Sequence, residues 1–158
     1  MLDLLRNLFG EGEEKPRFEG NDYRLAAAAL MVHAATIDGA LAPAERARLL
    51  AVVRQRFNLG EAAADELIET AIAAEQQAID LYQFTARLNR ALDEQGRARV
   101  VEMMWEIVFA DGAVTEFEDN LIWRAADLLH VSRNERIALR ERVAAARNPD
   151  MRGTATGG

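Results

Sequence analysis

Apolar residues recur at spacings of three and four along most of this chain, and this spacing is typical of amphipathic helices. Leu49, Leu50, Val53 and Phe57, for example, form an apolar stripe along one such segment. Glycine, proline and asparagine interrupt the pattern and place turns between the segments. We therefore expect an all-α fold of about seven helices. The predicted helices are residues 22–36, 43–57, 61–75, 81–92, 94–110, 116–130 and 132–147.

One short phrase occurs twice in the sequence. Asp38-Gly39 is followed six residues after the glycine by Glu45, and Asp111-Gly112 is followed in the same way by Glu118. Both copies stand between helix-periodic segments, so the pattern indicates a duplicated helix–turn–helix unit with an acidic turn in each copy. Superposing the turns gives two pseudo-symmetric three-helix repeats and one helix that bridges them. Their predicted bounds are 22–75 for repeat one, 80–92 for the bridging helix and 94–147 for repeat two.

The two ends of the chain differ from this central domain of residues 21–147. Residues 1–9 form a short amphipathic helix in this interpretation, and a charged linker completes residues 1–20. A helix of nine residues is unstable alone in water, so we expect it to dock on protein or, in the alternative, peripherally on a membrane. The tail, residues 148–158, has little apolar surface and is expected to be disordered.

The composition of the chain argues against several kinds of site and partner. With 158 residues the chain suits one domain, and without cysteine it has no disulfide and no thiolate metal site. The net charge of −7 opposes nucleic-acid binding and favours cations or a basic partner. The longest apolar run, Leu25 to Val32, is far shorter than the roughly 20 residues of a membrane span. A cytoplasmic protein without a transmembrane segment is therefore expected.

The acidic turns are the candidate chemistry. Each reproduces the second half of an EF-hand loop, where a glutamate follows a glycine by six residues, but neither has the acidic first half. Glu102 and Glu106 are four residues apart on a predicted helix that leads towards Asp111 and Glu118. Oxygen-rich clusters of this kind suit Ca²⁺ or Mg²⁺. The first repeat lacks the two helix glutamates, so the second turn is the stronger candidate for a cation site.

A structural interpretation of the same residues stays open. Aspartate and glycine favour turns through side-chain hydrogen bonds and backbone freedom, and Thr115 and Glu118 have the spacing of a capping box. Caps alone would then explain both turns. Clustered carboxylates could also serve a metal-dependent hydrolase, with Glu102, Glu106, Asp111 and Glu118 as its residues. No nucleophile motif or phosphate loop supports an enzyme.

Part of the second repeat resembles a known family. Residues 104–112, 118–122 and 125–132 are similar to the TerB-like tellurite-resistance family, and in particular to its small stand-alone bacterial proteins. The resemblance extends over roughly residues 22–145. It implies a helical domain with internal pseudo-symmetry and a role in stress response, often within membrane-associated complexes. It also implies an acidic patch that binds metal cations, and the matching positions here are Asp38, Glu45, Glu102, Glu106, Asp111 and Glu118.

The leading hypothesis follows from the repeat and the resemblance together. It is a non-enzymatic stress-response module that binds a divalent cation, Ca²⁺ or Mg²⁺, at its acidic turns. The same module is expected to dock protein partners with its helical surface. The first alternative is a purely structural interaction adaptor without a metal site, and the second is the metal-dependent hydrolase.

Overall fold

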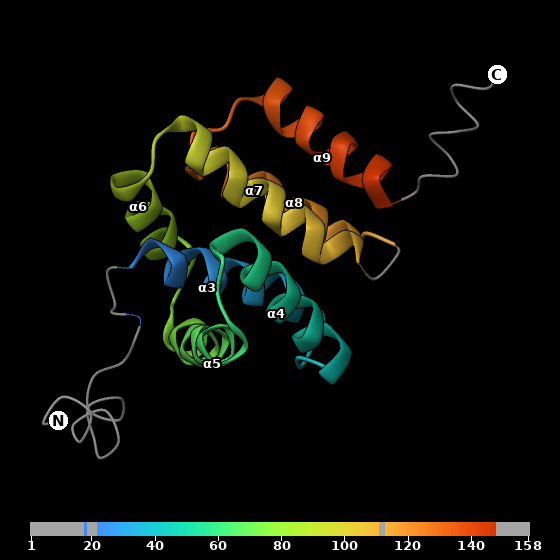
Figure 1. Ribbon diagram of the computed structural model, residues 1–158. Helices are drawn as coiled ribbons and strands as arrows, with labels where there is room; N and C mark the ends of the chain where they lie inside the picture. The colour runs from blue at the N-terminus through green and yellow to red at the C-terminus, as the bar shows by residue number, and fades with distance from the viewer. Residues whose placement is uncertain (1–17, 19–21, 111–112, 148–158) are drawn as a thin grey trace, which may run out of the picture.

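The computed structural model describes residues 18, 22–110 and 113–147 (Figure 1). These residues form seven α-helices and no strand, which confirms the all-α prediction. Each helix lies within two residues of its predicted bounds. The predicted helix over residues 1–9, its linker and the tail lie outside the described residues. The helices are α3 (Tyr23–Thr36), α4 (Pro43–Phe57), α5 (Glu61–Gln77), α6 (Tyr82–Ala91), α7 (Glu94–Phe109), α8 (Glu116–Leu128) and α9 (Arg133–Arg147).

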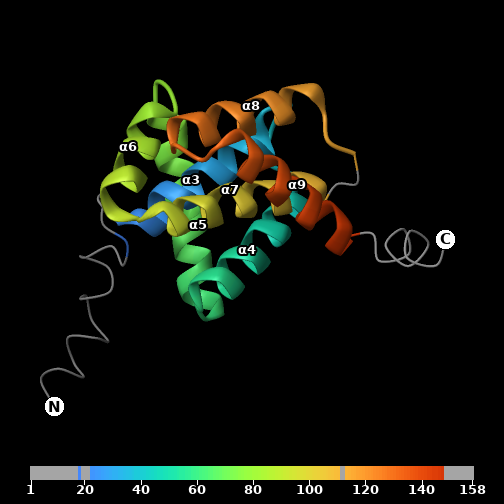
Figure 2. The ribbon, with the colours of Figure 1, turned by 90° about the horizontal axis from the view of Figure 1, so that it is seen from above.

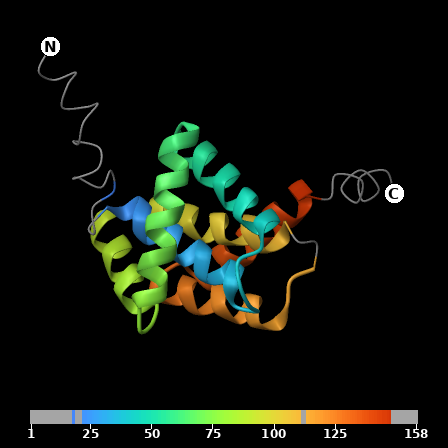
Figure 3. The same cartoon turned by 90° about the horizontal axis from the view of Figure 1, so that it is seen from below.

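Helix α3 lies at the centre of the fold. Every residue from Leu25 to Val32 is buried, because α5, α6 and α7 all pack against this helix. Figure 3 shows α3 between α5 and α8. A helix that is apolar on all sides is stable only inside a protein. The run of four alanines, Ala26 to Ala29, keeps the helix narrow, so its neighbours approach closely from several directions.

Helix α7 is the second central helix and contacts α3, α4, α8 and α9. Its pairing with α9 corresponds to the pairing of α3 with α5, as the predicted repeat requires. Superposing the two Asp-Gly turns aligns Leu49 with Ile122, and a one-residue gap after these helices aligns Leu67 with Leu139; all four residues are buried. The common contacts agree with a duplication, which itself stays a prediction from the sequence.

Phe18 is part of the core, although the sequence placed it in the linker. Its side chain is 1% exposed, and the guanidinium of Arg24 lies 4.7 Å from the centre of its ring. Asp22, the N-cap of α3, accepts hydrogen bonds from Nε and Nη2 of Arg24 at 3.1 and 2.8 Å and so holds the arginine over the ring. The packed domain therefore includes a residue before position 21.

The first acidic turn depends on the backbone freedom of Gly39. Its φ is 150°, a value that residues with a side chain rarely adopt, and its N–H donates to the Thr36 carbonyl at 3.0 Å. A Cβ added at this position would meet no atom within 4 Å, so the cost of a substitution is backbone strain alone.

Gly39→Ala is therefore expected to lower the free energy of unfolding by about 1–2 kcal/mol, measured by urea denaturation. Gly60→Ala is the matched control, because Gly60 has an ordinary φ of −73° and equally open space. Equal losses in the two variants would show that the conformation of Gly39 is not the cause.

Candidate functional site

Two of the predicted metal ligands cap helices. The carboxylate of Glu118 accepts a hydrogen bond from the Thr115 N–H at 2.8 Å, and the Thr115 hydroxyl accepts one from the Glu118 N–H at 3.1 Å. This reciprocal pair is the capping box that the spacing predicted. Glu45 holds the equivalent place in α4 and accepts from the Ala42 N–H at 2.9 Å. Ala42 has no hydroxyl, so the reciprocal bond is missing there.

Glu102 is the centre of an arginine cluster. It lies on α7, its side chain is only 8% exposed, and arginines from three helices reach its carboxylate. Arg142 of α9 donates to Oε2 from both Nε, at 2.9 Å, and Nη2. Arg56 of α4 contacts Oε1 at 3.0 Å, and Arg99 of α7 itself contacts the same oxygen at 3.3 Å. One buried carboxylate thus connects α4, α7 and α9.

The arginines decide the ionisation of Glu102. Burial alone raises the pKa of this carboxyl, because a charge is less stable away from water. The hydrogen bond from Arg142 and the charges of Arg56 and Arg142 outweigh burial, and the pKa lies below its ordinary value. Glu102 is therefore ionised at neutral pH and neutralises part of the surrounding positive charge.

Glu106 shares one arginine with Glu102. Arg56 reaches the Oε1 atom of Glu106 from Nε at 3.0 Å and from Nη2 at 2.8 Å. The two glutamates therefore occupy one face of α7, as their spacing predicted. The guanidinium of Arg56 bonds to both of them.

The structure describes five of the six predicted ligands and does not bring these five into one group. Glu102 and Glu106 lie together, Glu45 and Glu118 lie at the starts of separate helices, and Asp38 is exposed in the first turn. Asp111 lies outside the described residues. Within the part of the chain that the structure describes, no three histidine, aspartate or glutamate side chains are arranged to hold one metal ion. The cation site at the second turn stays a prediction.

A groove opens beside the arginine cluster, between α4 and α9. It has a volume of about 400 Å³, and α7 forms its floor. Figure 1 shows α4 and α9 on either side of α7, and Figure 2 shows α9 crossing in front of α7. We call this feature the α4–α9 groove. It is lined by Arg48, Ala51, Val52, Gln55 and Arg56 of α4, by Glu102 and Glu106 of α7 and its C-cap Ala110, and by Arg142, Val143, Ala146 and Arg147 of α9.

The charge of the groove is opposite to that of the whole chain. Among the described residues that line it, four are arginines and two are glutamates, whereas the whole chain carries −7. The composition predicted a preference for cations or a basic partner, whereas the described lining of this groove holds more basic than acidic side chains. Sequence reasoning missed it because the arginines come from helices far apart in the chain. The only local signal is that Arg48 and Arg56 lie eight residues apart, on one face of α4.

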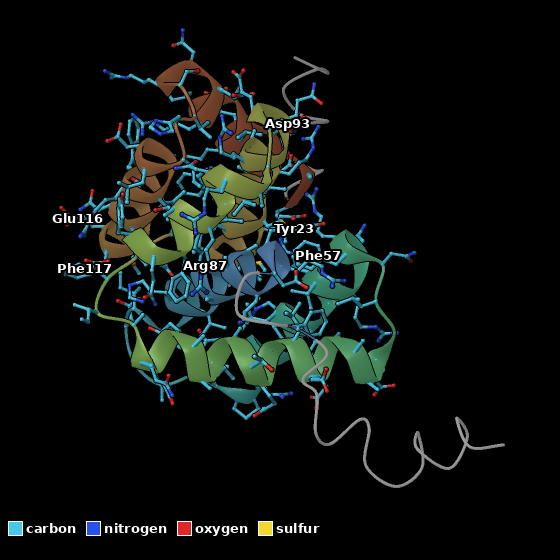
Figure 4. All side chains as sticks on the ribbon, turned by 90° about the vertical axis from the view of Figure 1, so that its left-hand side faces the viewer. Tyr23, Phe57, Arg87, Asp93, Glu116 and Phe117 are labelled. Atoms are coloured by element: carbon cyan, nitrogen blue, oxygen red, sulfur yellow. The ribbon has the colours of Figure 1, made fainter. Side chains whose placement is uncertain are left out.

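Few large apolar side chains are exposed elsewhere on the described surface. Figure 4 shows Phe117 and Glu116 pointing outward from the start of α8, and Phe117 is 66% exposed. The same view shows Tyr23 beside Phe57, where the two rings meet edge to face with centroids 6.1 Å apart. Neither feature forms a cavity comparable to the groove.

The fold and the groove define a small helical module in which one arginine cluster joins three helices. The family described as tellurite resistance protein TerB matches residues 24–141, about three quarters of the sequence, and this chain belongs to that family. The resemblance seen in the sequence is thus confirmed. No curated protein and no solved structure matches the chain.

A helix that crosses a bilayer needs roughly 20 predominantly apolar residues. None of the helices in the described residues combines the length and the apolar character that crossing a membrane requires.

Proposed function

We propose that this tellurite-resistance-type protein is a non-enzymatic module that docks protein partners, and that the α4–α9 groove is its docking surface. The observation that carries the proposal is the groove itself, an open, preformed hollow bordered by two helices and floored by a third. Grooves of this form are a common way for helical proteins to bind a partner segment.

The state of the carboxylates supports a binding role over catalysis. A general base needs a carboxylate within reach of the proton that it removes from a substrate. Glu102 and Glu106 bond to arginine, and Glu118 bonds to the backbone of its own helix start. The hydrolase hypothesis used these three residues, but in the folded chain their carboxylates stabilise contacts between helices or the start of a helix.

A photocrosslinking experiment tests the docking proposal. Benzoylphenylalanine is placed at Ala51 in the groove and, as a control, at Gln76, which is exposed on α5. We expect a discrete adduct with one partner protein, identified by mass spectrometry, from the Ala51 variant only. The same adducts from both positions, or none from Ala51, would contradict docking in the groove.

A divalent cation at the second turn is the second candidate function. The observation that favours it is the concentration of acid in the first turn of α8, where Glu116, Glu118 and Asp119 stand close in sequence to Asp111. Ca²⁺ and Mg²⁺ prefer such oxygen donors. A cation that binds only the native state raises its stability.

Ca²⁺ or Mg²⁺ is then expected to raise the thermal midpoint of the wild type by about 5–10 °C, relative to EDTA, at about a hundred times the dissociation constant. Differential scanning calorimetry provides the measurement. Asp111→Asn should abolish the rise, and Asp38→Asn is the matched control in the other repeat. If the midpoint of the wild type is the same with and without cation, the acidic turns serve only as turns and caps.

A further inference from the structure

We propose that the partner segment that occupies the α4–α9 groove is an acidic amphipathic helix. This inference rests on the proposed docking function and adds the chemistry of the partner. Three properties of the groove lead to it: its elongated shape, the small apolar side chains inside it and the excess of arginine around it.

The shape follows from the spacing of the lining residues. On α4 they recur every three to four positions from Arg48 to Arg56, so they form one continuous face about 12 Å long. Along α7 the lining residues Glu102 and Glu106 are four apart, and Ala110, the C-cap of the helix, continues the same spacing. A groove about two helical turns long, bordered by two helices, has the form that accepts a third helix.

The interior of the groove favours an apolar face on the partner. Ala51 of α4 and Ala146 of α9 are exposed, and Val52 and Val143 lie deeper beside them. Alanine has a small side chain, so the backbone of a docked helix can approach α4 and α9 closely. Burial of an apolar stripe on these four residues would supply the non-specific part of the affinity.

The border of the groove favours carboxylates on the flanks of the partner helix. Arg56 and Arg142 already bond to Glu102 or Glu106, whereas Arg147 contacts no carboxylate within the described residues. The side chain of Arg147 is exposed, and its hydrogen bond within the described residues is a long one, 3.4 Å, to the Ala110 carbonyl. An incoming carboxylate could replace this weak contact with a charge-assisted hydrogen bond. A basic helix would meet like charge instead, which opposes binding.

The test uses the full chain and three labelled peptides of about 16 residues, each held helical by a chemical staple because short helices are unstable alone. All three have the same leucine and alanine face, and their flanking positions are glutamate, glutamine or lysine. Fluorescence anisotropy measures binding. We expect the glutamate peptide to bind at least about tenfold more tightly than the lysine peptide, with the glutamine peptide between them.

Variants then locate the binding site. Arg147→Glu should weaken binding of the glutamate peptide about tenfold, whereas Arg124→Glu, the same charge change at an exposed position of α8, should change it less than twofold. Ala51→Trp should block the peptide without changing the circular dichroism spectrum, because Ala51 is exposed.

Several results would overturn the inference. The first two are equal affinities of the three peptides and no detectable binding of any peptide. The others are equal effects of Arg147→Glu and Arg124→Glu, and an affinity of the Ala51→Trp variant for the glutamate peptide that equals that of the wild type. Binding of inorganic phosphate, measured by isothermal titration calorimetry, without any peptide binding would assign the groove to a small anion. Self-association that Arg147→Glu abolishes, measured by analytical ultracentrifugation, would assign it to a second copy of the chain. If the Ala51 crosslink succeeds and the peptides do not discriminate, docking stands and the acidic partner is wrong.

Discussion

Glu102→Gln is expected to lower the free energy of unfolding by about 2–3 kcal/mol. The substitution keeps the shape of the side chain but removes the charge that Arg56, Arg99 and Arg142 surround. This loss is smaller than the loss expected on breaking a fully buried ion pair, because the side chains of Arg99 and Arg142 are 54% and 56% exposed and water screens their charges. Urea denaturation at neutral pH measures the loss.

The pH dependence gives a second readout for the same variant. The folded pKa of Glu102 is below its ordinary value of 4.5, so its ionised form stabilises the fold above pH 4.5. That contribution is lost as the pH falls through the pKa of Glu102 in the folded protein. Below this pH the carboxyl is protonated in the folded protein, as it already is in the unfolded protein. The stability difference between wild type and Glu102→Gln should therefore shrink below pH 4.5.

Glu106→Gln is the matched control for this prediction. Glu106 contacts only Arg56 of the three arginines and its side chain is 29% exposed, so its loss should be clearly smaller. If Glu106→Gln costs as much as Glu102→Gln, or if the difference from wild type persists unchanged at low pH, the arginine cluster does not have the structural role assigned to it.

Phe18→Ala is expected to lower the free energy of unfolding by about 3 kcal/mol. Its ring is buried beneath the guanidinium of Arg24, so truncation removes apolar burial and leaves a cavity. Thermal and urea denaturation of the full chain provide the measurement. Phe117→Ala is the matched control, because Phe117 is 66% exposed and should change stability by less than about 0.5 kcal/mol. Equal effects of the two substitutions would place Phe18 outside the packed core.

The sequence predicted the helices well because their signals are local. Apolar spacing marked each helix, and Thr115 with Glu118 marked one helix start through a spacing that the structure confirms as a capping box. Phe18 shows the limit of that approach. A single aromatic residue within a charged, glycine-containing stretch has no periodicity, so only tertiary packing reveals that it belongs to the core.

The candidate site was less predictable because its contacts are long-range. The spacing of Glu102 and Glu106 showed that they share a face of α7, but it carried no information on what faces them. Arg142 is 40 residues from Glu102, and Arg56 is 50 residues from Glu106. The net charge likewise averages over the whole surface, so it concealed a local excess of arginine.

The central claim is that the α4–α9 groove binds an acidic helix. Titration of the ¹⁵N-labelled full chain with the glutamate peptide, followed by ¹H–¹⁵N correlation spectra, tests it most directly. We predict that the largest shift changes occur at Ala51, Val52, Val143 and Ala146, on the two helices that border the groove. Changes centred on the exposed residues Ile79, between α5 and α6, and Tyr82, at the start of α6, or no changes at all, would contradict it.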